Sequence, residues 1–566
     1  MMLARLRPWA TVYGWALALA AILLWPVSGS GYLLARDMVF TPHQPLDLAA
    51  VGASSAAPRA VPVDALVALA EQVVDGAVIA RFAVLLPVVL AGVGAARLLR
   101  SASTAARLAT CGFAIWNPYV IERLALGQWA LLWGYAALPW LLDGIAHARP
   151  GRWAGRALAL AAASITPTGG LVAAVTAVVT VTGLRRGRRE IAATVGLAFA
   201  MQLPWLVPAL ISTASRTSDP AGVSAFAARA EHGGGALLTL LGGGGIWDAD
   251  VVPGSRAGAL PWVGIAVLGG AAVIGTRCLA ELAGARLVRC VAALAAVGLF
   301  LALFADLPGG HAVLTGLMRH VPGAGLLRDG QKFVMPLVLL AALLAGAAVE
   351  VAVRRWRSAP AIGLLLVGSL AVPLVLLPDG AATLRPALRP VHYPAEWSAA
   401  RSLVRGGDAL SLPLGSYRSF PWAPGRTVYD PASRLLRVPT VIDDRLAVSG
   451  HLIAGEDRLA ERVVAAVQAG PEAATRLAAL GIRWVVVEHR TPGPVPVLMG
   501  LPLVRDGADV SIYRVPAAVA PARAAPARVA AILAADVIAL LVLAVLVGAQ
   551  ALRRPRPAVR RAEEGT

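Results

Sequence analysis

The chain has 566 residues, of which 58% are hydrophobic, and its mean hydropathy is +0.70. A water-soluble core cannot bury that much apolar surface, so the composition indicates a polytopic membrane protein. The formal charge of +19 could suggest a nucleic-acid partner, but the arginines are spread over short loops between apolar runs, and we expect no nucleic acid to bind. The three cysteines form neither a zinc-ligand pattern nor a disulfide framework.

Apolar runs begin near the N-terminus and recur along the chain, and a bilayer requires about 20 residues per helix. The first run ends at Trp25-Pro26 without a small-residue cleavage site, so we interpret it as a membrane helix rather than a signal peptide. The long runs cover residues 9–28, 77–98, 127–146, 190–211, 258–276, 287–305, 333–352, 360–377 and 528–551. Shorter apolar segments cover residues 107–121, 155–166 and 168–184.

Arginine clusters in the connecting loops determine the predicted topology, because cytoplasmic loops are enriched in arginine and lysine. The clusters can all lie on the cytoplasmic side only if each shorter apolar segment also crosses the membrane. Pro167 and Gly169-Gly170 supply the turn between the segments 155–166 and 168–184. The prediction is a multi-pass protein of the cell membrane with about twelve helices and both termini in the cytoplasm. The clusters are Arg5 and Arg7; Arg97, Arg100 and Arg107; Arg149, Arg152 and Arg156; Arg185, Arg186, Arg188 and Arg189; Arg277 and Arg286; Arg354, Arg355 and Arg357; and Arg553, Arg554 and Arg556.

This topology places a large segment outside the membrane, residues 379–526, before the final helix at 527–552. The segment contains strand-like runs at 409–414 and 484–488 and a helical pattern at 457–480, so we expect an α/β or α+β domain. A basic cytoplasmic tail, 553–566, ends the chain. The remaining part, 1–378, is the predicted transmembrane domain, with outside loops 29–76, 212–257 and 306–332.

An acidic residue follows the first predicted helix closely, in the outside loop 29–76. Asp37 stands next to Arg36, where a carboxylate can face a site at the membrane surface and take a proton from a substrate. The alternative is a solvated interfacial acid, because loop acids are usually exposed. Competing acids in the same loop are Asp47, Asp64 and Asp75.

A second polar group follows the apolar segment 107–121, which breaks at Asn117-Pro118 and returns into the run 127–146. We expect a tight outside loop there to hold three polar side chains at the surface, as contacts to an acceptor or to a donor phosphate: Glu122, Arg123 and Gln128. The alternative is an aromatic belt with a salt-bridged loop, since Trp and Tyr favour membrane interfaces.

The outside loop 212–257 mixes acids, aromatic residues and glycines, a composition that suits contacts to a sugar but also suits an ordinary mobile loop. His232 and Asp248 are its candidate acceptor contacts.

The sequence RHVPGAGLLRDGQKF, residues 319–333, joins the end of the outside segment 306–332 to the start of the run 333–352. It contains Lys332, which is the only lysine of the sequence. If the next helix begins near Arg328, the side chains of Arg328 and Lys332 share one helix face at the membrane boundary and can bind an anionic headgroup. The alternative is boundary anchoring by snorkelling cations.

Sequence motifs for intracellular nucleotide chemistry are absent. There is no P-loop, dinucleotide fingerprint, GxSxG elbow or HExxH, and the glycine runs at 233–235 and 242–245 lack a following Lys-Ser/Thr. The cofactor stays open, since a divalent metal ion is compatible with the outside acids but no ligand pattern supports one.

The order of these parts resembles the GT-C superfamily of membrane glycosyltransferases, and more narrowly the YfhO-like and actinobacterial arabinofuranosyltransferase-like membrane proteins. The resemblance covers most of the chain and rests on the acid in the first outside loop and on four short motifs: NPYVIERLALGQW, Leu138-Pro139-Trp140, VPGAGLLRDGQKF and LAALGIRWVVV. It implies a polyprenyl-phosphate sugar donor, an acceptor on the outer side, and an essential carboxylate in the first loop, the position that Asp37 matches. The chain departs from better-known members in lacking a paired Asp-Glu or Asp-x-Asp there.

We therefore expect an inverting membrane glycosyltransferase that moves a sugar from a polyprenyl-phosphate donor to a glycan or lipid acceptor of the cell envelope. Asp37 would act as general base, with Arg328, Lys332 and Arg123 at the donor phosphate. The alternative is a non-catalytic transporter, or a glycan-binding or assembly protein, of the cell envelope. A transporter usually has internal repeats and mid-membrane charges, whereas here only Asp536 lies well inside an apolar run. Membrane lipids are partners in either case.

Overall fold

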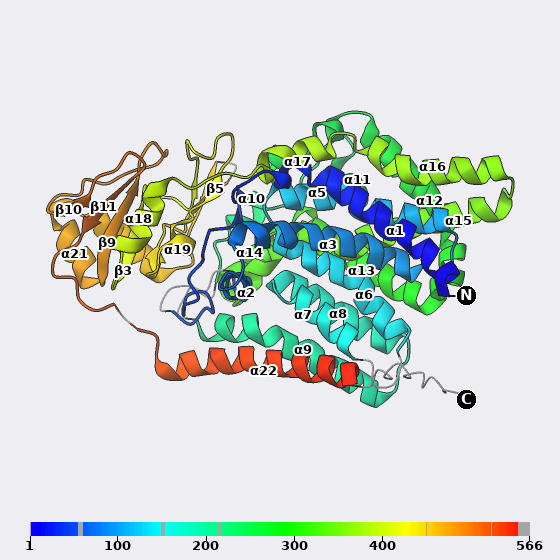
Figure 1. The fold of residues 1–566 in the computed structure, drawn as a ribbon, viewed down its shortest axis with the longest axis horizontal. Helices are drawn as coiled ribbons and strands as arrows, with labels where there is room; N and C mark the ends of the chain where they lie inside the picture. The colour runs from blue at the N-terminus through cyan, green and yellow to red at the C-terminus, as the bar shows by residue number, and fades with distance from the viewer. Residues whose placement is uncertain are drawn as a thin grey trace, which may run out of the picture.

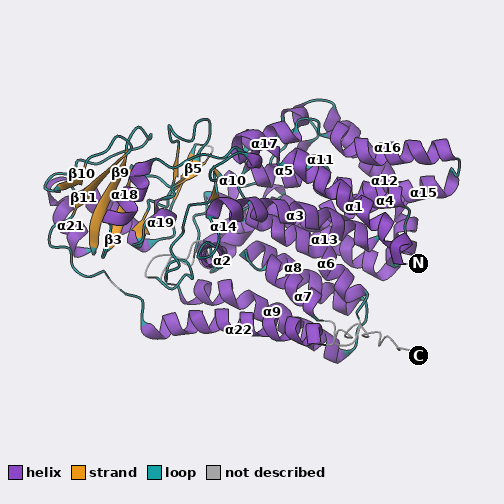
Figure 2. Ribbon diagram, viewed as in Figure 1, coloured by secondary structure: helices purple, strands orange, loops and turns teal. Residues whose placement is uncertain are grey.

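A computed structural model describes residues 2–54, 60–148, 153–212, 217–448, 450–521 and 523–552. Most of these residues form one bundle of helices, and a smaller region with strands adjoins one end of the bundle (Figure 2). The predicted arginines Arg149 and Arg152 and the basic tail 553–566 lie outside the described residues.

Every predicted apolar run coincides with a helix. The helices are α1 (Met2–Leu23), α3 (Gly76–Leu98), α4 (Thr104–Ile115), α6 (Trp129–Ala146), α7 (Ala154–Ala163), α8 (Pro167–Gly183), α9 (Arg188–Ile211), α12 (Leu260–Ala283), α13 (Ala285–Leu303), α15 (Met335–Arg355), α16 (Ala359–Leu376) and α22 (Pro526–Leu552). Among the described residues, seven helices are long and apolar enough to cross a bilayer, so the chain is a multi-pass membrane protein. The count of twelve crossings stays a prediction.

Side-chain caps and prolines decide where several of these helices begin. The Asp75 side chain accepts a hydrogen bond from Ala77 N at the start of α3, and Thr166 accepts one from Gly169 N at the start of α8. Pro167 occupies the first position of α8, where its missing N–H costs nothing. The predicted turn at residues 166–170 is therefore the start of α8, directly after the link from α7.

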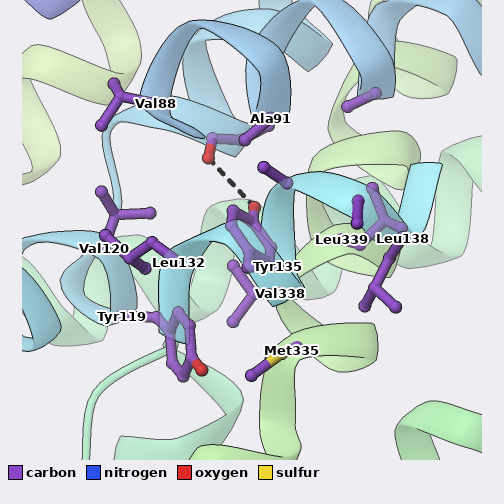
Figure 3. Packing of buried hydrophobic residues seen from close by; sticks show 14 of the residues in the cluster. Val88, Ala91, Tyr119, Val120, Leu132, Tyr135, Leu138, Met335, Val338 and Leu339 are labelled. Carbon is purple, nitrogen blue, oxygen red and sulfur yellow. Dashed lines mark hydrogen bonds between the residues drawn. The ribbon is translucent and has the colours of Figure 1, made fainter. Parts of the chain in front are cut away.

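The core near the site joins α6, α15 and a short helix, α5 (Pro118–Ala125). The Tyr119 and Tyr135 rings pack at a centroid distance of 5.7 Å, beside Met335 and Val338 (Figure 3). Each aromatic side chain buries a large apolar area, and the Tyr135 hydroxyl donates to the Ala114 carbonyl at 3.0 Å. This packing fixes α5 relative to the first turn of α15.

The second region is built on a five-stranded mixed sheet in the order β10-β11-β9-β3-β6. Its strands are β3 (Asp408–Leu412), β6 (Thr440–Val441), β9 (Ile482–Glu488), β10 (Leu503–Arg505) and β11 (Val510–Arg514). β3 pairs in parallel with β6 and β9, whereas β11 is antiparallel to β9 and β10. Both predicted strands are confirmed as β3 and β9.

The helical pattern predicted over 457–480 is two helices rather than one. α20 (Arg458–Val467) and α21 (Ala473–Ala479) are separated by Gly470, whose φ of +62° lies in the left-handed region, and by Pro471. The apolar faces of both helices pack against one side of the sheet, while α18 (Ala395–Leu403) packs against the other side.

The loop 29–76, which the sequence predicts to lie outside the membrane, packs on this second region. Its hairpin, β1 (Leu34–Ala35) and β2 (Met38–Val39), forms an apolar cluster with Val391, Phe420 and Val428. Backbone bridges also join Tyr32 to Val391 and Arg36 to Val428. The segment after α17 (Gly380–Leu388) and the first loop therefore form one structural unit at the end of the bundle.

The start of α1 and the end of α22 lie at the end of the bundle away from the sheet (Figure 1). The end of α15, which carries Arg354 and Arg355, and the α15–α16 link, which carries Arg357, are also distant from the sheet in this view. This arrangement is the one that the positive-inside interpretation requires, although which face is cytoplasmic stays a prediction.

The orientation can be measured with cysteines placed at two exposed serines. We expect Ser402→Cys, in α18, to react with a membrane-impermeant maleimide in intact cells, and Ser358→Cys, before α16, to react only after permeabilisation. The native cysteines Cys111, Cys278 and Cys290 are buried and should give little background. The reverse labelling pattern would invert the topology and place the site on the cytoplasmic face.

Candidate functional site

Two cavities lie between the helix bundle and the sheet-containing region. Their volumes are about 420 Å³ and about 860 Å³. Four residues line both cavities and so mark their junction: Asp37, Gln128, Lys332 and Tyr417. The junction combines side chains from three predicted outside segments and from the start of α6.

The smaller cavity lies against the ends of predicted membrane helices. Its walls include Trp129 and Leu131 of α6 and the α7–α8 turn around Pro167. The first loop adds apolar side chains, among them Phe40 and Val67. The larger cavity is lined instead by the sheet-containing region and by the 212–257 loop, with many charged side chains.

Asp37 lies at the tip of the β1–β2 hairpin, in a two-residue turn with Arg36. The φ of Arg36 is +49°, a left-handed conformation that a hairpin turn of this length favours and that non-glycine residues rarely adopt. A salt bridge of 2.5 Å to Asp248 and a backbone bridge to Val428 hold Arg36 in place.

The turn also docks on the segment before α6. Gly127 has a φ of +80°, and a Cβ there would lie 2.4 Å from the Ala35 carbonyl and 2.9 Å from Asp37 N, so only glycine fits. This close approach brings the Gln128 side chain beside Asp37.

Both carboxylate oxygens of Asp37 accept hydrogen bonds. Gln128 Nε2 donates to Oδ2 at 3.1 Å, and the Tyr417 hydroxyl donates to Oδ1. Burial and the adjacent Asp37 charge raise the pKa of Tyr417 well above its usual value, so this phenol stays a donor at neutral pH.

The expected helix face shared by Arg328 and Lys332 is wrong, because α15 begins only at Met335. Two short 3₁₀ segments, Ala324–Leu327 and Gly330–Val334, precede it. Gly330 packs closely against the Leu301 carbonyl, to which an added Cβ would come within 2.6 Å. The two cations nevertheless line the same larger cavity.

Their environments differ. Lys332 reaches both cavities, and its ammonium lies 3.5 Å from Asp329 Oδ2. The Arg328 guanidinium stacks over the Phe226 ring at 4.7 Å and is 3.9 Å from the Glu456 carboxylate. Lys332 is thus the cation that the junction of the two cavities holds.

The predicted surface position is wrong for Glu122 and Arg123. Both lie in α5 with 0% exposure, because the residues after Asn117-Pro118 form a buried helix instead of a tight exposed loop. The Asn117 side chain caps that helix by accepting from Val120 N at 3.0 Å. Gln128, one turn further on, is the member of the predicted group that reaches the cavities.

Arg123 forms a buried ion pair with Asp329. Nη1 and Nη2 donate to the two Asp329 oxygens at 2.7 and 2.9 Å, and Nε donates to Gln331 Oε1 at 2.8 Å. Burial alone would raise the pKa of Asp329, but the charges of Arg123 and Lys332 outweigh burial and lower that pKa to about 2. The carboxylate is therefore ionised at any physiological pH.

The other three predicted residues, Asp248, His232 and Glu122, lie in different places. Asp248 lines the larger cavity and pairs with Arg36. His232 packs on the Trp262 ring at 5.2 Å, away from the junction of the cavities. Glu122 lies among buried charges of the same loop, where Glu231 pairs with Arg256 at 2.6 Å.

Sequence reasoning missed Tyr417, which contacts Asp37 although the two residues are 380 positions apart in the sequence. The aromatic residues that follow it, Phe420, Trp422 and Tyr429, mark an apolar patch in an otherwise polar segment and are the signal that could have directed attention there. Within the ranges that the structure describes, no group of three or more His, Cys, Asp or Glu side chains is placed to hold a metal ion.

No family model and no curated protein matches the sequence. The fold is similar to that of the mycobacterial arabinofuranosyltransferase AftD, with a TM-score of 0.54 and 18% identity over 90% of this chain and 40% of AftD. A structure of a mutant form of AftD has a TM-score of 0.52 and 19% identity, over 90% of this chain and 41% of the mutant AftD chain. Over most of its length the chain therefore has the same fold as AftD. It spans about two fifths of the length of AftD.

In this fold the buried Arg123–Asp329 pair should contribute to stability. We expect Arg123→Met to destabilise the detergent-solubilised protein by roughly 3–5 kcal/mol, because the Asp329 carboxylate loses its bidentate partner. Arg328→Met, at a partly exposed site, should cost no more than about 1 kcal/mol. Thermal unfolding followed by tryptophan fluorescence compares the two variants, and equal melting temperatures would contradict the role assigned to the pair.

Proposed function

We propose that this protein is a membrane glycosyltransferase that moves a sugar from a polyprenyl-phosphate donor to a glycan or lipid acceptor of the cell envelope. The observation that carries the proposal is the placement of one carboxylate, Asp37, and one cation, Lys332, at the junction of two cavities in a GT-C fold. A base and a phosphate-binding cation at one junction are what sugar transfer from a lipid phosphate requires.

The two cavities suit the two substrates. The smaller one adjoins α6 and the α7–α8 turn and its walls are mostly apolar, with Asp64 and Arg434 among its charged side chains, so it fits the first part of a prenyl chain that enters from the membrane. The larger one faces the sheet-containing region and has many polar groups with an aromatic edge, Phe226 and Trp247, which suits a polyhydroxylated acceptor. Asp248 and Arg36 would contact that acceptor.

The reaction is a single displacement. Asp37 takes the proton of the acceptor hydroxyl, whose oxygen forms a bond to the anomeric carbon while the bond from that carbon to the phosphate oxygen breaks. The lipid phosphate leaves with the bonding electron pair, and the positive charge of Lys332 stabilises the charge that develops. One displacement inverts the anomeric configuration.

The other predicted residues take indirect roles or none. Arg328 supports the phosphate from the edge of the larger cavity, where its guanidinium is partly exposed. Arg123 is too deeply buried to touch a substrate and acts through its partners. We assign no substrate contact to Glu122 or His232, because neither lies at the junction of the cavities. The site faces the outer side of the membrane, with both termini in the cytoplasm.

The activity can be tested with purified protein in lipid vesicles and a panel of radiolabelled polyprenyl-phosphate sugars. The panel begins with arabinofuranose, because the structurally similar AftD is an arabinofuranosyltransferase. Transfer of label to a cell-envelope acceptor would support the proposal. Binding of a glycan without transfer from any donor would favour a glycan-binding or assembly protein instead.

Replacing the proposed base should remove transfer without unfolding the protein. Asp37→Asn keeps the shape of the side chain but cannot accept the proton, so we expect turnover to fall roughly 10²- to 10⁴-fold. Asp47→Asn, in the same loop, is the matched control and should have a mild effect. Near-normal transfer by the Asp37→Asn protein would show that another group is the base.

The cation at the junction gives a separate prediction. Lys332→Gln should weaken apparent donor affinity by about 2–3 kcal/mol, which is roughly a 30- to 150-fold change, because a charge-assisted contact to phosphate is lost. Lys332→Arg keeps the charge but replaces a compact ammonium with a planar fork, and should recover only part of the affinity. Donor titrations that leave both variants unchanged would make Lys332 an interface anchor.

A further inference from the structure

The side chain of Gln128 stands between the buried ion pair and the proposed base. Its Oε1 accepts from Arg123 Nη1 at 2.6 Å, and its Nε2 donates to Asp37 Oδ2 at 3.1 Å. The two ends of one amide therefore connect a fully buried arginine with a carboxylate that opens into both cavities.

The orientation of this amide follows from the chemistry of its neighbours. Arginine has five N–H donors and no acceptor, so the end of Gln128 that faces Arg123 has to be the oxygen. The NH₂ end then faces Asp37 and donates to it. Arg123 itself cannot rotate, because Asp329 holds it by two hydrogen bonds and Gln331 accepts from its Nε.

The same ion pair also contacts the proposed phosphate-binding cation. Asp329 Oδ2, which accepts from Arg123, lies 3.5 Å from the Lys332 ammonium. The distance between base and cation is thus set from one buried point, through Gln128 on one side and Asp329 on the other.

We propose that Gln128 is a positioning residue for Asp37, with its amide orientation imposed by Arg123. In this arrangement Gln128 donates a hydrogen bond to Oδ2 of Asp37, and Tyr417 donates one to Oδ1. The two hydrogen bonds hold the carboxylate in one rotamer, which faces the acceptor hydroxyl. The inference rests on the proposed function, since it gives Gln128 a task only if Asp37 takes a proton there.

Two substitutions separate positioning from simple packing. Gln128→Met keeps the volume but removes the donor, so turnover should fall about tenfold or more while the donor KM stays unchanged, because Lys332 is not altered. Gln128→Glu also removes the donor and adds a carboxylate that Arg123 keeps ionised. Its charge beside Asp37 should shift the acidic limb of the pH–rate profile upward by about one unit or more.

A second measurement does not require sugar transfer. A hydrophobic carbodiimide reacts with protonated carboxyl groups, and mass spectrometry of the peptide containing Asp37 gives its labelling as a function of pH. In the Gln128→Glu protein this labelling should persist to higher pH than in the wild type. Gln72→Glu makes the same chemical change at an exposed position of the first loop and should leave both pH dependences unchanged.

The outcomes distinguish the inference from the function. If Asp37→Asn abolishes transfer but Gln128→Glu has the wild-type pH profile and labelling curve, Gln128 does not position the base and the inference fails alone. If Asp37→Asn transfers normally, the base assignment fails as well. A lower melting temperature for both Gln128 variants with unchanged kcat and pH dependence would give Gln128 a structural role only.

Discussion

The buried ion pair between Arg123 and Asp329 is the interaction on which the site depends. Removing two charges from water is costly, and the cost is offset only because the geometry is bidentate and further acceptors surround the guanidinium. Such a pair tolerates little movement. It therefore fixes α5, which carries Arg123, against Asp329 and the 3₁₀ segment Gly330–Val334 that follows it and carries Lys332.

Apolar packing supports that pair from the membrane side. The Tyr119 and Tyr135 rings, Met335 and Val338 join α5, α6 and the first turn of α15 in one dense core (Figure 3). Densely packed interiors transmit small displacements, because side chains have no free volume into which to relax. A displacement of any of these helices would consequently change the distance between Asp37 and Lys332.

The sheet-containing region completes the site rather than merely covering it. Tyr417 contacts Asp37, and the apolar cluster around Val391 and Phe420 holds the hairpin that carries Asp37. The two cavities exist because this region and the helix bundle meet along the first loop. The carboxylate of Asp37 at their junction is open to both cavities, so the proposed donor and acceptor would approach it from different sides.

The sequence by itself determined the membrane helices, the strands β3 and β9, and three of the four residues at the junction: Asp37, Gln128 and Lys332. Those features depend on apolar runs, on turn residues, and on charges next to helix ends. Each of these patterns is formed by residues that are close together in the sequence. Only the tertiary structure decided the fate of Glu122 and Arg123, the break before α15, and the partnership of Tyr417 with Asp37. A charge becomes buried, and residues 380 positions apart come into contact, only when separate elements pack together. The residues near one position in the sequence do not determine that packing.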